Sequence, residues 1–364
     1  MREGWTYKKL GEVCEIICGQ DYKNVESPDG KYPIYGTGGI MGYANQFRCP
    51  AFSIIVGRKG SINNPIYVEE NFWNVDTAFG IVPSKESLLS KFFYYFCKKY
   101  DFTKHNVAVT IPSLRRIDLL KIPIPVPPLS EQQRIVSELD LLSSIIEKKK
   151  AQLKEYDKLA QSIFYDMFGD PMTNEKGWEV KKLGEVAKEK LSYGSGASAI
   201  HYNNEVRYVR ITDIKDDGEL NSDMVSPNIY DEKYLLNDGD ILFARSGATV
   251  GKTFLYKAKY GKCIYAGYLI RLIPNTKIVL PSYVYGFTKS SYYRSFVAKV
   301  QNAVAQPNIN AKQYSELSIP LPPLSLQQSF ASKIEAIEHQ KALVQQSITE
   351  TESLFNSRMD YYFD

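Results

Sequence analysis

Two segments of this 364-residue chain each occur twice, in the same order, and this duplication restricts the possible folds more than any other feature. Gly4–Val13 reads GWTYKKLGEV and returns as GWEVKKLGEV at Gly177–Val186. Ile122–Gln133 reads IPIPVPPLSEQQ and returns as LSIPLPPLSLQQ at Leu317–Gln328. The residues between the two segments show no such similarity, and the second copy has 22 more of them.

The duplication predicts the domain organisation, because self-similarity over a long period indicates repeated structural units. We expect two globular units, at residues 1–128 and 170–323, which are followed by long helices at 129–169 and 324–364. Within the units, short apolar runs broken by glycine, such as AFSIIVG and NDGDILFARSG, are typical of β-strands. The expected fold is therefore α+β, with an internal pseudo-two-fold repeat.

The two predicted helices carry apolar residues at alternating intervals of four and three, interrupted only by Lys149, Lys341 and Thr351. Such spacing, sustained over many turns, is typical of a coiled coil. Each helix could instead pack alone on its own unit, but such a helix usually follows the 3.6-residue period. We therefore predict that the helices pair with each other through the following residues: Ile135, Leu139, Leu142, Ile146, Leu153, Ile163, Phe330, Ile334, Ile337, Val344, Ile348 and Phe355.

Each predicted helix has a start signal in the sequence. Ser130 with Gln133, and Ser325 with Gln328, fit the capping-box pattern in which Ser caps the helix and Gln bonds back to it. The second globular unit follows the first helix directly and precedes the second helix. This order predicts an antiparallel helix pair with one globular unit at each end.

The stretch GDILFARSGATVGKT, Gly239–Thr253, is close to the phosphate-binding loop of nucleotide hydrolases. That loop reads GxxxxGK[ST] and is followed by a helix whose amides bind phosphate. Here Ser246 stands at the first glycine position, and the residues that follow alternate as in a strand. The sequence therefore disfavours an ATP site, and a plain hairpin turn is the stronger of these two interpretations.

A third interpretation of this stretch is a contact with the phosphates of a long ligand such as DNA. The first unit carries IIVGRKGSI, Ile54–Ile62, at the corresponding place, so that Arg58 and Arg245 match. Arginine offers a fork of donors, and glycine lets main-chain amides approach a phosphate closely. The net charge of +4 does not itself argue for nucleic acid, so any contact must come from local basic patches.

The chain has few residues suited to metal or nucleophilic chemistry. There are five Cys without a CxxC pair and only three His, which disfavours a zinc site and leaves no credible catalytic set. We expect reduced, mostly buried thiols in a cytoplasmic protein. We also expect no signal peptide, because MREGWTYKKL lacks an apolar segment, and no transmembrane helix.

Several motifs, duplicated and in order, make the chain resemble a known family. They are W…KLGEV, YVRITDIKDDGEL, GDILFARSGATVGK and IPLPPLSLQQ before a long helix. From Gly4 to the last helix the sequence resembles the specificity (S) subunit of type I restriction–modification enzymes.

The resemblance implies two target-recognition domains at opposite ends of an antiparallel pair of long helices. Each domain would bind one half of a bipartite sequence in double-stranded DNA. The helices would set the gap and dock two modification subunits, which carry AdoMet and methylate adenine. Restriction subunits that use ATP and magnesium would join for cleavage, while this chain would have no catalytic activity, cofactor or metal of its own. Two alternatives remain open, a fragment of a fused methyltransferase–nuclease and a coiled-coil interaction scaffold that does not recognise DNA.

The dissimilar residues between the repeated segments are where different base contacts would lie, so we expect two different half-sites rather than a palindrome. At each single position a solvated surface residue or a turn glycine is the alternative. The candidate DNA contacts are Tyr35, Gly36, Thr37, Gly38, Arg58, Lys59 and Ser61 in the first unit, and Arg207, Arg210, Thr212, Arg245, Ser246, Gly247, Thr249 and Lys252 in the second.

Overall fold

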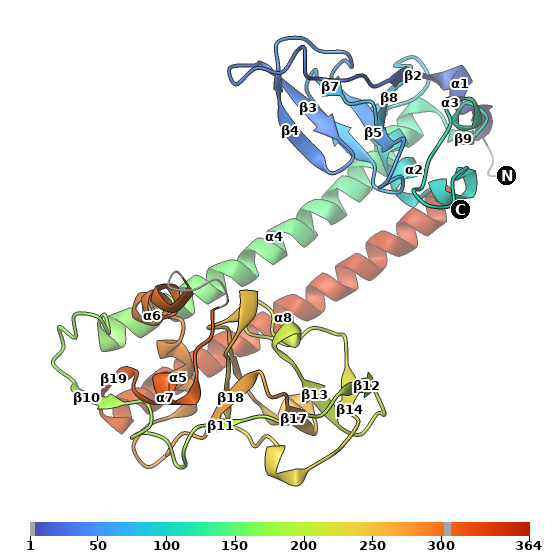
Figure 1. Cartoon of the computed structure of the whole chain (residues 1–364). Helices are drawn as coiled ribbons and strands as arrows, with labels where there is room; N and C mark the ends of the chain where they lie inside the picture. Colours follow the sequence, from blue (N-terminus) through green and yellow to red (C-terminus); the bar gives the residue numbers. More distant parts are fainter. Residues whose placement is uncertain (1–3, 302–306) are drawn as a thin grey trace. The chain divides into compact units, whose positions relative to one another are not determined.

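The computed structural model describes residues 4–301 and 307–364 of the chain. The chain divides into two compact units. Unit 1 consists of Met1–Lys149 with Gln346–Asp364, and unit 2 consists of Lys150–Gln345. Each unit combines short strands with parts of two long helices, which confirms the predicted α+β class (Figure 1).

Unit 1 is built mainly from short strands. Its central sheet is antiparallel with the order β2-β8-β5-β6, and a second sheet has the order β4-β3-β7 with β7 parallel to β3. Every residue of β5 is buried, as expected for a strand with a neighbour on both sides. The elements before the first long helix are β1 (Thr6–Lys9), α1 (Leu10–Val13), β2 (Cys14–Cys18), β3 (Tyr32–Gly36), β4 (Gly39–Ala44), β5 (Ser53–Gly57), β6 (Ile66–Val68), β7 (Trp73–Asn74), β8 (Ala78–Pro83), α2 (Ser90–Lys99), α3 (Arg116–Leu119) and β9 (Pro123–Val126).

Unit 2 follows the same plan. Its central sheet has the order β11-β18-β15-β16, and β13 pairs with β17 in parallel, as β3 does with β7. The elements between the long helices are β10 (Glu179–Lys182), β11 (Ser192–Tyr193), β12 (Ala199–His201), β13 (Arg207–Val209), β14 (Val225–Pro227), β15 (Ile241–Ala244), β16 (Thr253–Leu255), β17 (Cys263–Tyr265), β18 (Leu269–Leu272), α5 (Pro281–Phe287), α6 (Ser291–Gln301), α7 (Ala311–Ser315) and β19 (Ser318–Leu321). The residues between the repeated segments, although dissimilar in sequence, therefore share the order of the central sheet and one parallel strand pair.

The two repeated segments of each unit pair with each other. In unit 1, β1 and β9 are antiparallel, with Thr6 opposite Val126. In unit 2, β10 and β19 pair in the same register, with Glu179 opposite Leu321. The two repeated segments of each unit, far apart in the sequence, thus form one two-stranded sheet together.

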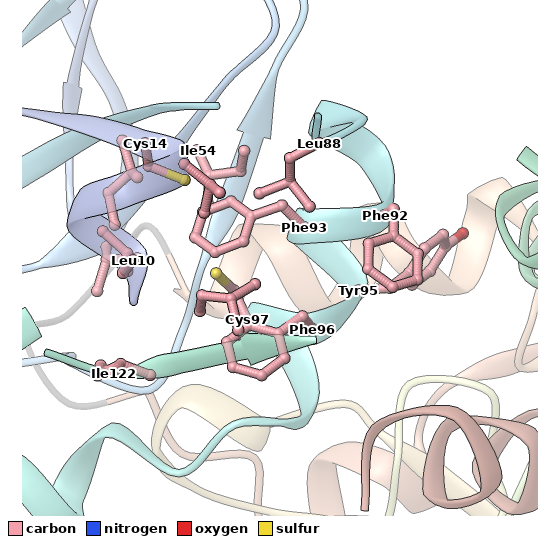
Figure 2. Packing of buried hydrophobic residues seen from close by; sticks show 14 of the residues in the cluster. Leu10, Cys14, Ile54, Leu88, Phe92, Phe93, Tyr95, Phe96, Cys97 and Ile122 are labelled. Carbon is pink, nitrogen blue, oxygen red and sulfur yellow. The ribbon is translucent and has the colours of Figure 1, made fainter. Parts of the chain in front are cut away.

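The core of unit 1 lies between its central sheet and α2. Figure 2 shows Leu10, Cys14 and Ile54 packed with Phe93 and other apolar side chains of α2. All of these side chains are buried, and burying apolar surface is the main favourable term in folding.

The cysteines are free thiols, and four of the five are buried, as expected from the sequence. Burial raises the pKa of the Cys49 thiol to about 12, so it stays neutral and packs as a small apolar group.

The long helices α4 (Leu129–Phe168) and α8 (Leu324–Phe363) run antiparallel within each unit. In unit 1, Glu138 of α4 accepts a hydrogen bond from Tyr362 at 2.6 Å and pairs with Arg358 at 2.6 Å. In unit 2, the rings of Phe164 and Phe330 have centroids 5.8 Å apart. Farther along α4, Lys149 meets Thr351 in unit 1, while in unit 2 the earlier Asp157 meets Lys341. Within each unit, later residues of α4 therefore meet earlier residues of α8, which confirms the predicted pairing direction.

The predicted helix-pairing residues are all withdrawn from solvent, and they have two roles. Ile135, Leu139, Leu142, Phe330, Ile337 and Ile348 are buried, and Ile146, Leu153, Ile163, Ile334, Val344 and Phe355 are partly buried. Ile135 and Leu139 also belong to the apolar core of unit 1, and Phe330 belongs to that of unit 2. The helices therefore pack on the domains as well as on each other.

The polar residues that interrupt the apolar pattern form hydrogen bonds and ion pairs at the pairing face. In unit 1, Lys149 Nζ donates to Ser347 and to Thr351 Oγ1, the latter at 3.3 Å. In unit 2, Lys341 Nζ lies 2.8 Å from a carboxylate oxygen of Asp157. Polar groups at such positions specify the register of paired helices at some cost in stability.

The capping boxes predicted at the starts of the two long helices are wrong. α4 begins at Leu129, and the carbonyl of Pro128 accepts hydrogen bonds from the N–H groups of Glu131 and Gln132 at 2.9 and 3.0 Å. Ser130 therefore lies inside the first turn rather than at the cap. α8 likewise begins at Leu324, one residue before Ser325.

A buried glutamine in the first turn attaches each helix to its domain instead. Gln132 Nε2 donates to the carbonyls of Pro127 and Ser87, both at 2.8 Å, and its Oε1 accepts from Leu89 N–H at 2.7 Å. Gln327 repeats this arrangement, with Leu280 N–H donating to it at 2.8 Å. Neither side chain is exposed to solvent. The bonds to Ser87 and Leu89, and those to Ile278 and Leu280, fix each helix against the segment that precedes α2 or α5.

We expect Gln132→Ala to lower the free energy of unfolding by about 2–4 kcal/mol, because it leaves several buried main-chain groups without partners. The neighbouring exposed Gln133→Ala is the matched control and should change it by less than about 0.5 kcal/mol. Urea denaturation of the purified chain measures both. Equal, small losses for the two variants would contradict the role assigned to Gln132.

Candidate nucleic-acid interface

The residues that follow β5 in unit 1 are held between two other loops. Arg58 N–H donates to the carbonyl of Thr77 at 2.8 Å, and Gly60 N–H donates to the carbonyl of Pro112 at 2.9 Å. Leu114 N–H donates in turn to the carbonyl of Arg58 at 2.9 Å. The Arg58 loop therefore has a main chain fixed from both sides, while the side chains of Lys59 and Ser61 are exposed.

Unit 2 holds Arg245 by the same three hydrogen bonds. Arg245 N–H donates to Tyr268 at 3.0 Å, Gly247 N–H donates to Pro307 at 3.2 Å, and Ile309 N–H donates to Arg245 at 2.8 Å. Arg58 and Arg245 thus occupy equivalent places, as the sequence predicts.

A glycine closes the loop in each unit. Gly60 and Gly247 have φ angles of 79° and 68°, in the left-handed region that favours glycine, and nothing lies within 4 Å of where a Cβ would stand. In unit 2 a short 3-10 turn, Gly247–Thr249, leads into strand β16. Because no helix follows, the stretch lacks the helix N-terminus of a phosphate-binding loop, as expected from the sequence.

Most of the candidate contacts on these loops are accessible. Lys59, Ser61, Thr212 and Gly247 are exposed, and Arg58, Ser246 and Thr249 are partly buried. Contact of these residues with DNA remains a prediction.

The end of β3 and the turn that follows it contain four more candidates. Thr37 and Gly38 lie at the tip of the turn and are accessible. Tyr35 packs edge-to-face on Phe72, with ring centroids 5.6 Å apart, and burial raises its pKa. Gly36 is buried, and a Cβ there would lie 2.6 Å from the sulfur of Met41. Gly36 therefore makes room for the side chain of Met41.

The structure places the candidate Arg207 in the interior of unit 2. It lies in β13, is only 7% exposed, and donates from Nη2 to the carbonyl of Asn221 at 2.7 Å. We therefore assign Arg207 to the framework of the domain and not to the interface.

Two other candidate cations are neutralised by carboxylates. Arg210 lies 2.7 Å from the buried carboxylate of Asp213, and Lys252 lies 2.7 Å from Asp216. An ion pair with a protein carboxylate weakens the attraction of each cation to a phosphate. Arg210 and Lys252 are therefore weaker candidates than Arg58 and Arg245.

Sequence reasoning missed two tyrosines beside Arg245. Tyr193 ends β11 and is 42% exposed, and Tyr268 precedes β18 and is 61% exposed. The guanidinium carbon of Arg245 lies 4.9 Å from the centroid of the Tyr193 ring. The sequence carries no signal for this arrangement, because Tyr193 is 52 residues before Arg245.

Sequence reasoning also missed an exposed apolar segment beside the Arg58 loop of unit 1. Val107, Val109 and Ile111 are each about half exposed or more, in the segment that bonds to Gly60 through Pro112. Apolar side chains at the edge of a DNA interface can contact thymine methyl groups.

We expect Arg207→Ala to lower the free energy of unfolding by about 2–3 kcal/mol, because it removes a buried charged donor and leaves the Asn221 carbonyl unpaired. Arg245→Ala should cost about 1 kcal/mol or less, the value of its contact with Tyr193. Chemical denaturation of the two purified variants compares them. A larger loss for Arg245→Ala than for Arg207→Ala would contradict this division of roles.

Among residues 4–301 and 307–364, no group of three or more His, Cys, Asp or Glu side chains is placed to hold a metal ion. Within the same residues, no helix is long and apolar enough to cross a membrane.

The duplicated central sheet, the paired helices and the two equivalent arginine loops define a protein of two similar units. The chain belongs to the family of type I restriction–modification DNA specificity domains, whose family model matches residues 2–155 and 175–353. The two matches coincide with the two copies of the repeat. Recognition of a DNA sequence for a type I restriction–modification complex is thus the role of this chain.

The chain is similar to known specificity subunits. It is 28% identical over 218 residues to the type I restriction enzyme MjaIX specificity subunit of Methanocaldococcus jannaschii, a match that covers 54% of this chain and about half, 49%, of that relative. It is 22% identical to a putative type I specificity subunit, S.HindORF215P, of Haemophilus influenzae, over 98% of this chain and 93% of the relative. The crystal structure of the type I S subunit from M. genitalium has the same fold, with a TM-score of 0.61, 17% identity and coverage of 98% of this chain and 95% of that one.

Proposed function

We propose that unit 1 and unit 2 each bind one half of an asymmetric, bipartite DNA sequence. The observation that carries this proposal is the equivalence of the Arg58 and Arg245 loops, which are fixed by the same main-chain bonds but carry different surroundings. Two equivalent loops suit two half-sites. Different neighbouring side chains suit half-sites that differ in sequence, since base edges are distinguished by side-chain contacts in the grooves.

We further propose that α4 and α8 act as a spacer that sets the gap between the half-sites. Each helix has 40 residues without a break, which corresponds to about 60 Å at 1.5 Å per residue. The polar pairs of Lys149 and of Lys341 support this role, because they would hold the spacer in one register.

The partners in this proposal are two modification subunits, which dock on the helices, and restriction subunits that join for cleavage. Each unit exposes apolar side chains on its helical part, Leu141 and Leu354 in unit 1 and Leu159 and Leu343 in unit 2. Exposed leucines of this kind suit burial against other helices. This chain then acts as the non-catalytic recognition component, while AdoMet, ATP and magnesium bind to the partner subunits.

The spacer role predicts the effect of a matched insertion. Seven residues with the same apolar spacing, added after Lys149 in α4 and after Gln345 in α8, keep the pairing and lengthen the pair by about 10 Å. We expect the gap between the half-sites to grow by up to about 3 base pairs at 3.4 Å each, while both half-site sequences stay unchanged. Mapping of methylated adenines by the assembled complex measures both properties.

An insertion in α4 alone is the control, and it should impair assembly because it breaks the pairing register. The proposal fails if the doubly extended complex methylates at an unchanged gap, or if either half-site sequence changes.

A further inference from the structure

Four arginines lie in or next to the strands of unit 2, and Arg245 differs from the other three in its hydrogen bonds. Arg207, Arg210 and Arg271 donate to Asn221, Asp213 and Leu235 respectively. Nε is buried without a partner in Arg207, Arg245 and Arg271 alike, but only Arg245 also lacks, among the described residues, an acceptor for its Nη groups. The Nη groups of Arg245 are therefore the guanidinium donors of this region that are left for a ligand.

The guanidinium of Arg245 is nevertheless held in one place. Its carbon lies 4.9 Å from the centroid of the Tyr193 ring, so the side chain packs against an aromatic surface. The Tyr193 hydroxyl accepts a hydrogen bond from Ala311 N–H at 3.0 Å, which fixes the far end of that ring. The main chain of Arg245 is bonded on both sides, to Tyr268 and Ile309. The donor fork is therefore positioned before any ligand arrives.

The equivalent place in unit 1 lacks this arrangement. The residue equivalent to Tyr193 is Cys18, since Gly19 N–H and Gly194 N–H make the same bond to Ala78 and Leu269, both at 3.2 Å. Arg58 Nη1 donates instead to the carbonyl of Asp76 at 3.3 Å. One of the two arginines is thus partly satisfied by its own domain, and the other is not.

We propose that Arg245, positioned by Tyr193, binds one guanine base of the half-site recognised by unit 2. This inference rests on the proposed function, in which unit 2 recognises one half-site. A planar fork with free donors matches the O6 and N7 acceptors that guanine presents in the major groove. A fork that is already held by an aromatic ring loses less conformational freedom on binding than a mobile one. Tyr193 is a positioning residue here, and Arg58 makes a contact that does not depend on the base.

The test uses the complex assembled from this chain and its modification subunits, acting on DNA in which the wild-type half-sites are randomised one position at a time. We expect Arg245→Ala to lose about 10- to 100-fold in preference for guanine at one position of one half-site, and nothing at the other half-site. Tyr193→Leu should lose about 2- to 5-fold at that same position, whereas Tyr193→Phe, which keeps the ring, should retain most of the preference.

Arg58→Ala is the matched control and should lower methylation evenly across sequences. Arg245→Ala that lowers methylation evenly, or that relaxes a position other than a G·C pair, overturns the guanine contact and leaves the proposed function intact. A wild-type complex with no sequence preference at all would instead overturn the proposed function. Thermal melting of each complex separates loss of recognition from loss of folding.

Discussion

The structure depends on the attachment of each long helix to its domain through one buried glutamine. Gln132 and Gln327 each use both ends of the amide, so that carbonyls and an N–H group from two other segments are satisfied at once. A buried amide with all these partners is directional in a way that apolar packing is not. The glutamine therefore fixes the direction in which the helix leaves the domain. The strand that directly precedes each helix, β9 or β19, is held by its pairing with β1 or β10.

This division allows recognition to change without changing the framework. The repeated segments supply the two-stranded sheet, the glutamine and the start of the helix. The loops at the ends of the central sheets carry Arg58 and Arg245 on a main chain fixed by the same bonds, yet Tyr193 in unit 2 corresponds to Cys18 in unit 1. Side chains at such places are not part of the core, so they can differ between the copies at little cost in stability.

The sequence predicted the features that depend on local or repeated patterns. The duplication, the two long helices and their antiparallel pairing follow from similarity, four-three spacing and chain order. The predicted capping boxes were wrong because the carbonyl of Pro128 accepts the first hydrogen bonds of α4, which leaves Ser130 no capping role. Gln132 was overlooked because glutamine is mostly an exposed residue.

The candidate site was predicted less completely, because its contacts join distant residues. The equivalence of Arg58 and Arg245 could be predicted by aligning the strands that precede them. The Tyr193 ring that packs on Arg245 belongs to another strand, and no sequence spacing predicts that contact. Arg207 looked accessible because a strand of alternating residues does not say which face is buried. Asp213, three residues after Arg210, was a usable signal for an ion pair that the sequence interpretation did not weigh.

The central claim, that two equivalent units bind two different half-sites, is tested most directly by mapping methylated adenines across the genome of cells with and without this chain. The account predicts methylation at a bipartite motif, with two unlike defined halves and an unspecified gap, that disappears when the chain is removed. Methylation that persists without the chain, or a motif that is continuous or made of two identical halves, would contradict it.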